Sequence, residues 1–146
     1  MLIYFDTCCL QRPLDDRTQP RINIEAEAVL TILGIIEKSN ITLVSSEVLN
    51  YELSKIPDKN REGRVREILS ISRKYIVIND DIELTAAEYN KKGINAMDAL
   101  HLACATNMGV NYFCTTDDKF LNRAKREILS STKIVSPLEL ILEVTK

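Results

Sequence analysis

The chain contains no tryptophan, and aromatic residues make up only 5% of its 146 residues. Single-stranded nucleic acids are often held by bases stacked on aromatic side chains, so this shortage argues against a binding surface of that kind. An excess of positive charge is also missing, because 19 Lys and Arg stand against 21 Asp and Glu. Proteins that bind nucleic acid non-specifically are usually basic. The charge balance therefore neither favours nor excludes a polyanionic substrate.

Histidine and paired cysteines are scarce as well. The only histidine is His101, and Cys8, Cys9, Cys104 and Cys114 form no Cys-x-x-Cys pair. Zinc sites usually need such pairs, so we expect no zinc and interpret the cysteines as small buried residues in a reducing cytosol. We expect His101 to pack beside a sheet or to hydrogen-bond locally rather than to act as a base.

Long hydrophobic runs are absent from the sequence. No apolar stretch approaches the ~20 residues that a membrane-spanning helix needs, and the N-terminus reaches Asp6 without the pattern of a signal peptide. The composition, 45% hydrophobic and 27% charged, is typical of a globular protein. We therefore expect one domain covering residues 1–146, located in the cytoplasm.

Short apolar segments alternate with amphipathic ones along the whole chain. We predict strands at 2–5, 41–44, 75–78, 112–115 and 133–135, a loop with one helical turn at 7–20, and helices at 22–38, 46–56, 61–74, 80–92, 95–108, 116–126 and from 136 onward. Ser45 or Ser46 is expected to cap the second of these helices, and Asp80 or Asp81 the fourth. This alternation predicts an α/β fold, with a mostly parallel sheet and helices on both faces.

The helix start at Asn95 is the clearest in the sequence. Asn95 is a suitable N-cap, Asp98 occupies the N3 position, and Gly109 ends the segment. The predicted buried stripe consists of Met97, Leu100, Ala103, Cys104 and Met108. Asp98 is either a capping acid that the helix dipole favours or part of an acidic site.

Three further acids occupy positions from which they could meet Asp98. Asp6 and Asp117 follow predicted strands, and Glu52 lies between apolar neighbours near the start of a helix. Sites in α/β folds form beyond the carboxyl ends of the strands, so we expect these acids to converge there. Clustered carboxylates suit Mg²⁺ or Mn²⁺, singly or in pairs. Alternatively, Asp6 and Asp117 cap a turn and a helix, and Glu52 is a solvated acid.

Four segments, taken in order, resemble the PIN domain over nearly the whole chain. They are Asp6-Thr7, Ser46-Glu-Val-Leu-Asn-Tyr-Glu52-Leu, Met97-Asp98-Ala-Leu-His-Leu-Ala-Cys-Ala105 and Thr115-Thr-Asp117-Asp-Lys-Phe120. The third and fourth segments are the most specific. The resemblance implies a PIN-like nuclease domain: a metal-dependent ribonuclease, commonly the VapC-type toxin of a toxin–antitoxin pair.

By this resemblance, Asp6, Glu52, Asp98 and Asp117 hold Mg²⁺ or Mn²⁺, and Thr115 supports the site. Glu47 competes with Glu52 for the second position, and Asp118 supplements or replaces Asp117. The implied partners are an RNA substrate, an antitoxin protein and a second copy of the chain in a homodimer.

Two other interpretations remain. In the first, the chain is a non-catalytic module that binds a structural ion or a partner, and in the second it is a phosphatase that uses the same metal chemistry. We also expect Asp15 and Asp16 to be ordinary surface acids. Basic residues at 61, 64, 66, 73 and 74 are expected to form a solvated face or to steer RNA.

Overall fold

The computed structural model describes residues 1–146 and contains one five-stranded sheet in the order β3-β2-β1-β4-β5. Every neighbouring pair is parallel, which confirms the predicted α/β fold with a parallel sheet. The strands are β1 (Leu2–Phe5), β2 (Thr42–Ser46), β3 (Lys74–Ile76), β4 (Tyr112–Cys114) and β5 (Lys133–Val135). No helix has both the length and the apolar character that a membrane crossing requires.

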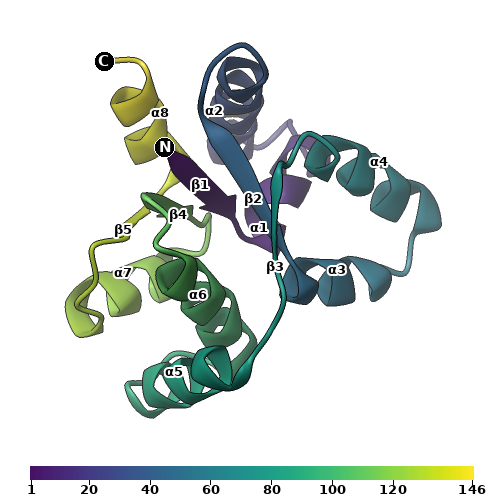
Figure 1. The fold of residues 1–146 in the computed structure, drawn as a ribbon. Helices are drawn as coiled ribbons and strands as arrows, with labels where there is room; N and C mark the ends of the chain where they lie inside the picture. Colours follow the sequence, from purple (N-terminus) through teal and green to yellow (C-terminus); the bar gives the residue numbers. More distant parts are fainter.

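Helices cover both faces of the sheet (Figure 1). They are α1 (Thr7–Gln11), the 3₁₀ helix η1 (Arg12–Leu14), α2 (Pro20–Glu37), α3 (Glu47–Ser54), α4 (Lys59–Leu69), α5 (Asp80–Lys91), α6 (Ala96–Met108), α7 (Asp118–Glu127) and α8 (Pro137–Val144). Helices α2 and α8 pack together on one face, and α5 packs against α6 on the other. Parallel strands need such coverage because both of their faces are apolar.

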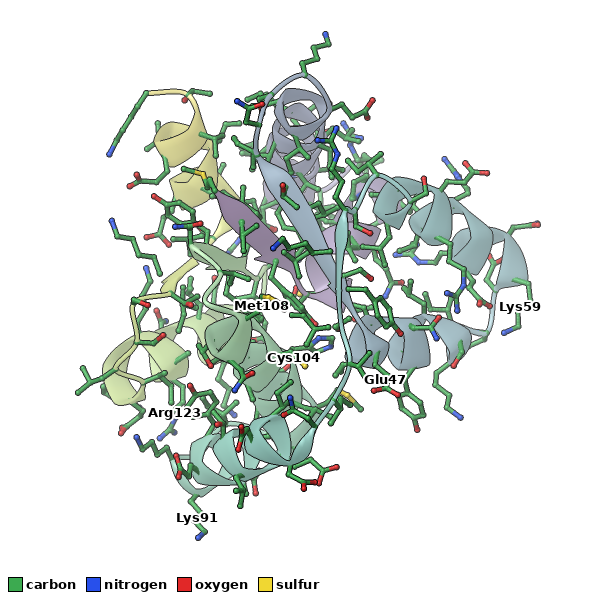
Figure 2. All side chains as sticks on the ribbon, in the orientation of Figure 1. Glu47, Lys59, Lys91, Cys104, Met108 and Arg123 are labelled. Carbon is green, nitrogen blue, oxygen red and sulfur yellow. The ribbon has the colours of Figure 1, made fainter.

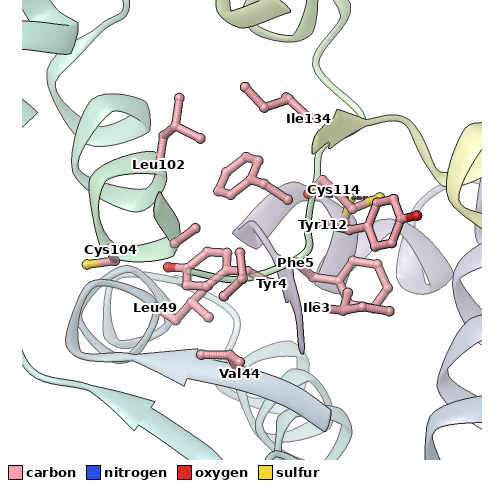
Figure 3. Packing of buried hydrophobic residues seen from close by; sticks show 14 of the residues in the cluster. Ile3, Tyr4, Phe5, Val44, Leu49, Leu102, Cys104, Tyr112, Cys114 and Ile134 are labelled. Atoms are coloured by element: carbon pink, nitrogen blue, oxygen red, sulfur yellow. Dashed lines mark hydrogen bonds between the residues drawn. The ribbon is translucent and has the colours of Figure 1, made fainter. Parts of the chain in front are cut away.

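The core is built on β1 and β4, whose side chains are buried on both faces. Tyr4 stacks on Phe113 with ring centroids 5.3 Å apart, and Phe120 from α7 meets Phe113 edge-on. Figure 3 shows Tyr4 between the sheet and α6, with Leu49 beside it. This packing fixes the starts of α3, α6 and α7 against the central strands.

The strand order reverses between β1 and β4. From β1 the chain moves outward through β2 to β3, and it then returns to the other side of β1 through β4 and β5. Asp6 extends the β1 ladder by one bond, since its N–H donates to the carbonyl of Cys114 at 3.1 Å. Asp6 and the residues after Cys114 therefore leave the sheet side by side at the switch point, where α/β folds place their sites.

The predicted cap at Asn95 is confirmed. Its side chain accepts a hydrogen bond from the backbone N–H of Asp98, and Gly109 ends α6 in the left-handed region with φ 73°. The predicted stripe is only partly buried, however, because Met108 lies in the exposed last turn (Figure 2). His101, Leu102 and Ala105 are buried in α6 as well.

Three local predictions were wrong. Residues 7–20 contain α1 and η1 rather than a loop with one turn, because Asp6 caps α1. Asn79, not Asp80 or Asp81, caps α5: it is the extended residue whose side chain accepts from Ile82 N–H. Helix α4 begins at Lys59 and ends at Leu69, since Asp58 caps it and the chain then returns to the sheet.

Candidate metal centre at the switch point

All four predicted acids line one pocket beyond the carboxyl ends of β1 and β4. The lining consists of Asp6, Thr7, Cys8, Gln11, Arg12, Glu52, Asp98, His101, Thr116 and Asp117. The acids come from four elements that are far apart in sequence, so only the fold brings them together. The cationic side chain in this lining is Arg12, which Asp15 and Glu25 already neutralise.

Three of the acids are held by helix starts. Asp6 and Asp117 are the N-caps of α1 and α7 and accept from the N–H groups of Cys9 and Phe120, each at 3.1 Å. Asp98 lies at N3 of α6, where its carboxylate accepts from the Asn95 amide at 2.8 Å. Capping and pocket lining are therefore compatible roles, because each carboxylate has a second oxygen available for a ligand.

Glu52 is held by two side chains instead. Thr7 donates to its Oε1, and His101 Nε2 bonds to the same oxygen. On the other side of the ring, Nδ1 lies 2.6 Å from the Tyr4 hydroxyl, which lies 2.7 Å from Ser46 Oγ. A buried chain of hydrogen bonds thus connects the second strand to the pocket through His101.

Of the two alternatives expected for His101, packing beside the sheet is confirmed, whereas its hydrogen bonds are not local. His101 is 1% exposed and both ring nitrogens are occupied by residues distant in sequence. An ionised Glu52 can only accept a hydrogen bond, so Nε2 of His101 donates to it. In a neutral imidazole the other nitrogen, Nδ1, then carries no hydrogen and accepts from the Tyr4 hydroxyl. This arrangement leaves no free nitrogen for a general base.

The electrostatics of the pocket differ from acid to acid. Burial raises the pKa of Asp6, and burial together with the nearby Asp117 carboxylate raises the pKa of Asp98. Burial acts in the same direction on Glu52, but the hydrogen bonds from His101 and Thr7 outweigh it and hold the pKa of Glu52 below its usual value. Asp6 and Asp98 therefore carry a cost of charge burial that a bound cation would relieve.

The donor set fits a hard divalent ion. It offers carboxylate oxygens from four acids, with hydroxyls of Thr7 and Thr116 in the same lining, and oxygen ligands are those that Mg²⁺ and Mn²⁺ prefer. The carboxylates are spread around the pocket rather than gathered tightly. The compact group of metal-type side chains, with ligand atoms within 4.8 Å of one another, is Asp6, Cys8 and Cys9.

The remaining candidate residues lie around the pocket or outside it. Thr115 is buried behind the lining, where its Oγ1 accepts from the N–H of Asp117 at 3.1 Å. Asp118 points away and pairs with Arg21. Glu47 lies at the start of α3 (Figure 2), where it accepts from the N–H of Ile78, so Glu52 is the acid of α3 that reaches the pocket.

The basic residues of α4 do not form a uniform solvated face. Arg61 donates to Gln11, at 2.7 Å, and to the carbonyl of Leu14, and it pairs with Asp15. It therefore ties α4 to the segment that carries Thr7 and Cys8. Asp15, expected to be an ordinary surface acid, is held between Arg61 and Arg12.

The raised pKa of Asp98 predicts a stability effect in protein stripped of metal. An acid whose pKa is raised in the folded protein binds more protons in the folded state than in the unfolded state. Its contribution to the free energy of unfolding therefore falls as pH rises from about 3.9, the unfolded pKa, through the folded pKa. Asp98→Asn is therefore expected to match the free energy of unfolding of wild type near pH 4 and to be more stable than wild type at pH 7, with a higher Tm. Thermal melts in chelator across this range measure the difference.

Asp118→Asn is the matched control, because Arg21 lowers the pKa of Asp118. This exposed aspartate is expected to give no gain at neutral pH. A lower Tm for Asp98→Asn than for wild type at pH 7 would contradict the assigned burial cost.

These features define the class of protein. The family model described as PIN domain matches residues 3–127, and the chain belongs to that family. The predicted family is thereby confirmed.

Solved structures share the fold at low sequence identity. VapBC2 from Rickettsia felis, bound to a DNA fragment from their promoter, matches with a TM-score of 0.64 and 16% identity, over 93% of this chain and 98% of that one. PAE2754 from Pyrobaculum aerophilum matches with a TM-score of 0.58 and 15% identity, over 99% of this chain and 90% of that one. VapBC-1 from nontypeable Haemophilus influenzae matches with a TM-score of 0.58 and 17% identity, over 94% of this chain and 99% of that one.

A curated relative matches more narrowly. Peroxidase 43 from Arabidopsis thaliana is 27% identical over 90 residues, which are 59% of this chain and 27% of that protein. The chain thus spans about a quarter of the length of this relative. No activity is carried over from it.

Proposed function

We propose that the chain is a divalent-metal-dependent endoribonuclease whose PIN domain extends over residues 1–146. The observation that carries the proposal is that Asp6, Glu52, Asp98 and Asp117 all line the same pocket at the switch point. These four acids would hold one or two Mg²⁺ or Mn²⁺ ions, with Thr115 supporting Asp117 from behind. Membership of the PIN domain family supports a nuclease.

The residues of the pocket have separate tasks in this proposal. A divalent ion supplies activation of water and stabilisation of the charge that develops on a phosphodiester. Asp6, Asp98 and Asp117 hold their carboxylates at fixed helix starts, and Thr7 and His101 orient Glu52. Both nitrogens of His101 are engaged, so its ring has no free nitrogen to act as a base.

A second pocket, adjoining the first, supports a phosphate-bearing substrate. It shares Asp98 and Asp117 with the acidic pocket and adds Lys119 and Arg123 from α7. Neither cation forms an ion pair in the structure. Arg123 lies against Gly93, which has φ 96°, and a Cβ added at Gly93 would approach the Arg123 guanidinium to 3.0 Å. We propose that these cations contact the RNA backbone.

Replacing both cations is expected to weaken substrate binding more than chemistry. Lys119→Gln with Arg123→Gln should raise KM for RNA with little change in kcat, because phosphate contacts away from the reacting bond act equally on ground and transition states. The salt dependence of binding should fall by about one unit of slope for each lost contact. Steady-state cleavage at several salt concentrations measures both effects.

Arg126→Gln is the matched control on the same helix. Arg126 is exposed, pairs with Glu127 and lies outside both pockets, so its loss should leave KM near that of wild type. A rise in KM for each removed charge as large in Arg126→Gln as in the double variant would show that the effect follows net charge rather than the pocket.

The proposed partners follow from the neighbours in structure. The chain would be the toxin of a type II toxin–antitoxin pair, bound by an antitoxin and assembled as a homodimer, in line with the VapBC structures that share its fold. We also propose a cytoplasmic location, with which four free cysteines are compatible.

The proposal is tested with purified protein and a mixed pool of structured RNA. Cleavage is expected with Mg²⁺ or Mn²⁺ and not with chelator, and it should return when the ion is restored. Absence of cleavage together with absence of Mn²⁺ binding in calorimetry would contradict the proposal and favour the non-catalytic module.

A further inference from the structure

The base of the acidic pocket contains thiols as well as oxygens. Cys8 Sγ lies 2.9 Å from Asp6 Oδ1, and Cys9, the next residue of α1, has its Sγ in the same group. The three ligand atoms lie within 4.8 Å of one another, and two of the three side chains are buried. This group was not expected from the sequence, because adjacent cysteines do not have the spacing of a zinc motif.

The spacing of these atoms suits a thiophilic cation. Zinc bonds of about 2.3 Å to sulfur and about 2.0 Å to a carboxylate oxygen, in a tetrahedron, place ligand atoms about 3.5 Å apart. The ligand atoms of Asp6, Cys8 and Cys9 lie within 4.8 Å of one another, so ion binding would draw them closer together. A further thiol is close by, since Cys114 Sγ lies 3.7 Å from Cys9 Sγ, the separation expected for two sulfurs on one zinc ion.

The group belongs to the fold and not to a loose surface. Asp6 is fixed as the N-cap of α1, Cys9 donates its thiol hydrogen to the Cys114 carbonyl, and Cys8 is half-buried on the pocket side. An ion can therefore reach Cys8 and Asp6 from the pocket, while Cys9 and Cys114 lie behind them.

We propose that Asp6, Cys8 and Cys9 form a site for a thiophilic divalent cation such as Zn²⁺, with Cys114 as a candidate fourth ligand. Binding replaces the thiol hydrogens of the ligating cysteines, which leave as protons to the buffer. Because Asp6 also belongs to the proposed Mg²⁺ or Mn²⁺ site, the two kinds of ion compete for its carboxylate. The thiol site itself does not depend on the proposed function, whereas its inhibition of cleavage rests on it.

Titration of metal-free, reduced protein with Cd²⁺ tests the site without any activity measurement. Cd²⁺ bound to thiolate absorbs in the ultraviolet, so a band should grow to saturation at one ion per chain, and Zn²⁺ should remove it. Cys8→Ser should weaken Cd²⁺ binding by more than the roughly 10–100-fold cost of losing a second-shell partner. Cys104→Ala should retain the band, because Cys104 lies in α6 outside the pocket (Figures 2 and 3).

No saturable band in wild type would overturn the proposal, as would an unchanged band in Cys8→Ser. Thermal melts of each variant establish that it is folded, and Cys8, being half-buried, is the ligand whose change least disturbs the core. Calorimetry with Mn²⁺ on Cd²⁺-loaded protein then tests this competition: loss of Mn²⁺ binding supports a shared Asp6, and undiminished binding overturns it. A Cd²⁺ band in protein that never binds Mn²⁺ would keep the thiol site and contradict the proposed nuclease instead.

Discussion

Asp98→Asn is expected to reduce metal-dependent RNA cleavage by about 10²–10⁴-fold, because a divalent ion contributes several kcal/mol of transition-state stabilisation and each 1.36 kcal/mol is a factor of ten in rate. The loss should come from the missing charge alone. Asparagine keeps the size of the side chain and an oxygen that can bond to Asn95, so the start of α6 is preserved. Single-turnover cleavage of RNA at saturating Mn²⁺ measures the change.

Two controls separate loss of charge from loss of fold. Metal-free Asp98→Asn should have a Tm no lower than that of wild type at neutral pH, because the raised pKa of Asp98 shows that its charge is costly in the folded protein. Asp118→Asn, the next acid after Asp117, should cleave at nearly the wild-type rate because it pairs with Arg21 outside the pocket. Full activity in Asp98→Asn would remove Asp98 from the proposed site.

His101→Asn is expected to weaken Mn²⁺ binding by about 10–100-fold, the usual cost of losing a second-shell partner. Asparagine can reproduce the bond of Nδ1 to Tyr4, but it is too short to reach Glu52. Without that bond, Glu52 loses one of the two contacts that orient it. Calorimetric titration of each folded variant with Mn²⁺ measures the affinity.

His101→Gln is the matched variant, because the glutamine amide lies near the position of Nε2 and can still donate to Glu52. It should recover most of the affinity that asparagine loses. A purely structural role for this buried residue predicts instead that the two variants lose affinity in proportion to their loss of stability. Equal Mn²⁺ affinity in His101→Asn and wild type would contradict the orienting role.

The strands and the helix starts could be predicted because their signals are local. The run Leu2–Phe5 is apolar on both faces, and Ser136 with Glu139 forms a capping box at the start of α8, where a helix was predicted. Sequence order then places Asp6 and Asp117 directly after predicted strands, and the structure shows that these strands are parallel neighbours, which brings both acids to one edge. Asp6, Glu52, Asp98 and Asp117 could therefore be expected at one site before any coordinates.

Contacts between distant segments could not be predicted in this way. The link from Tyr4 through His101 to Glu52 joins a strand and two helices, and none of the three residues has a local pattern that indicates it. Arg61 and Asp118 form pairs with distant residues for the same reason. Such pairs depend on the register of packed elements, which a single sequence does not specify.

Capping and metal binding were treated as alternatives for Asp6, Asp98 and Asp117, and the structure shows that the two roles are compatible. The bonds at the helix starts use one carboxylate oxygen of each acid, and all three acids also line the pocket. A helix start also favours a nearby negative charge, so it partly offsets the cost of gathering the acids. Local stability and a candidate site therefore share the same side chains.

The most direct test of the central claim is an anomalous-scattering map from crystals soaked in Mn²⁺. We predict one or two peaks in the pocket at the switch point, at coordination distance from carboxylate oxygens of Asp6, Glu52, Asp98 and Asp117, and no peak in crystals of Asp98→Asn at the same position. A map at saturating Mn²⁺ with no peak in that pocket would contradict the account.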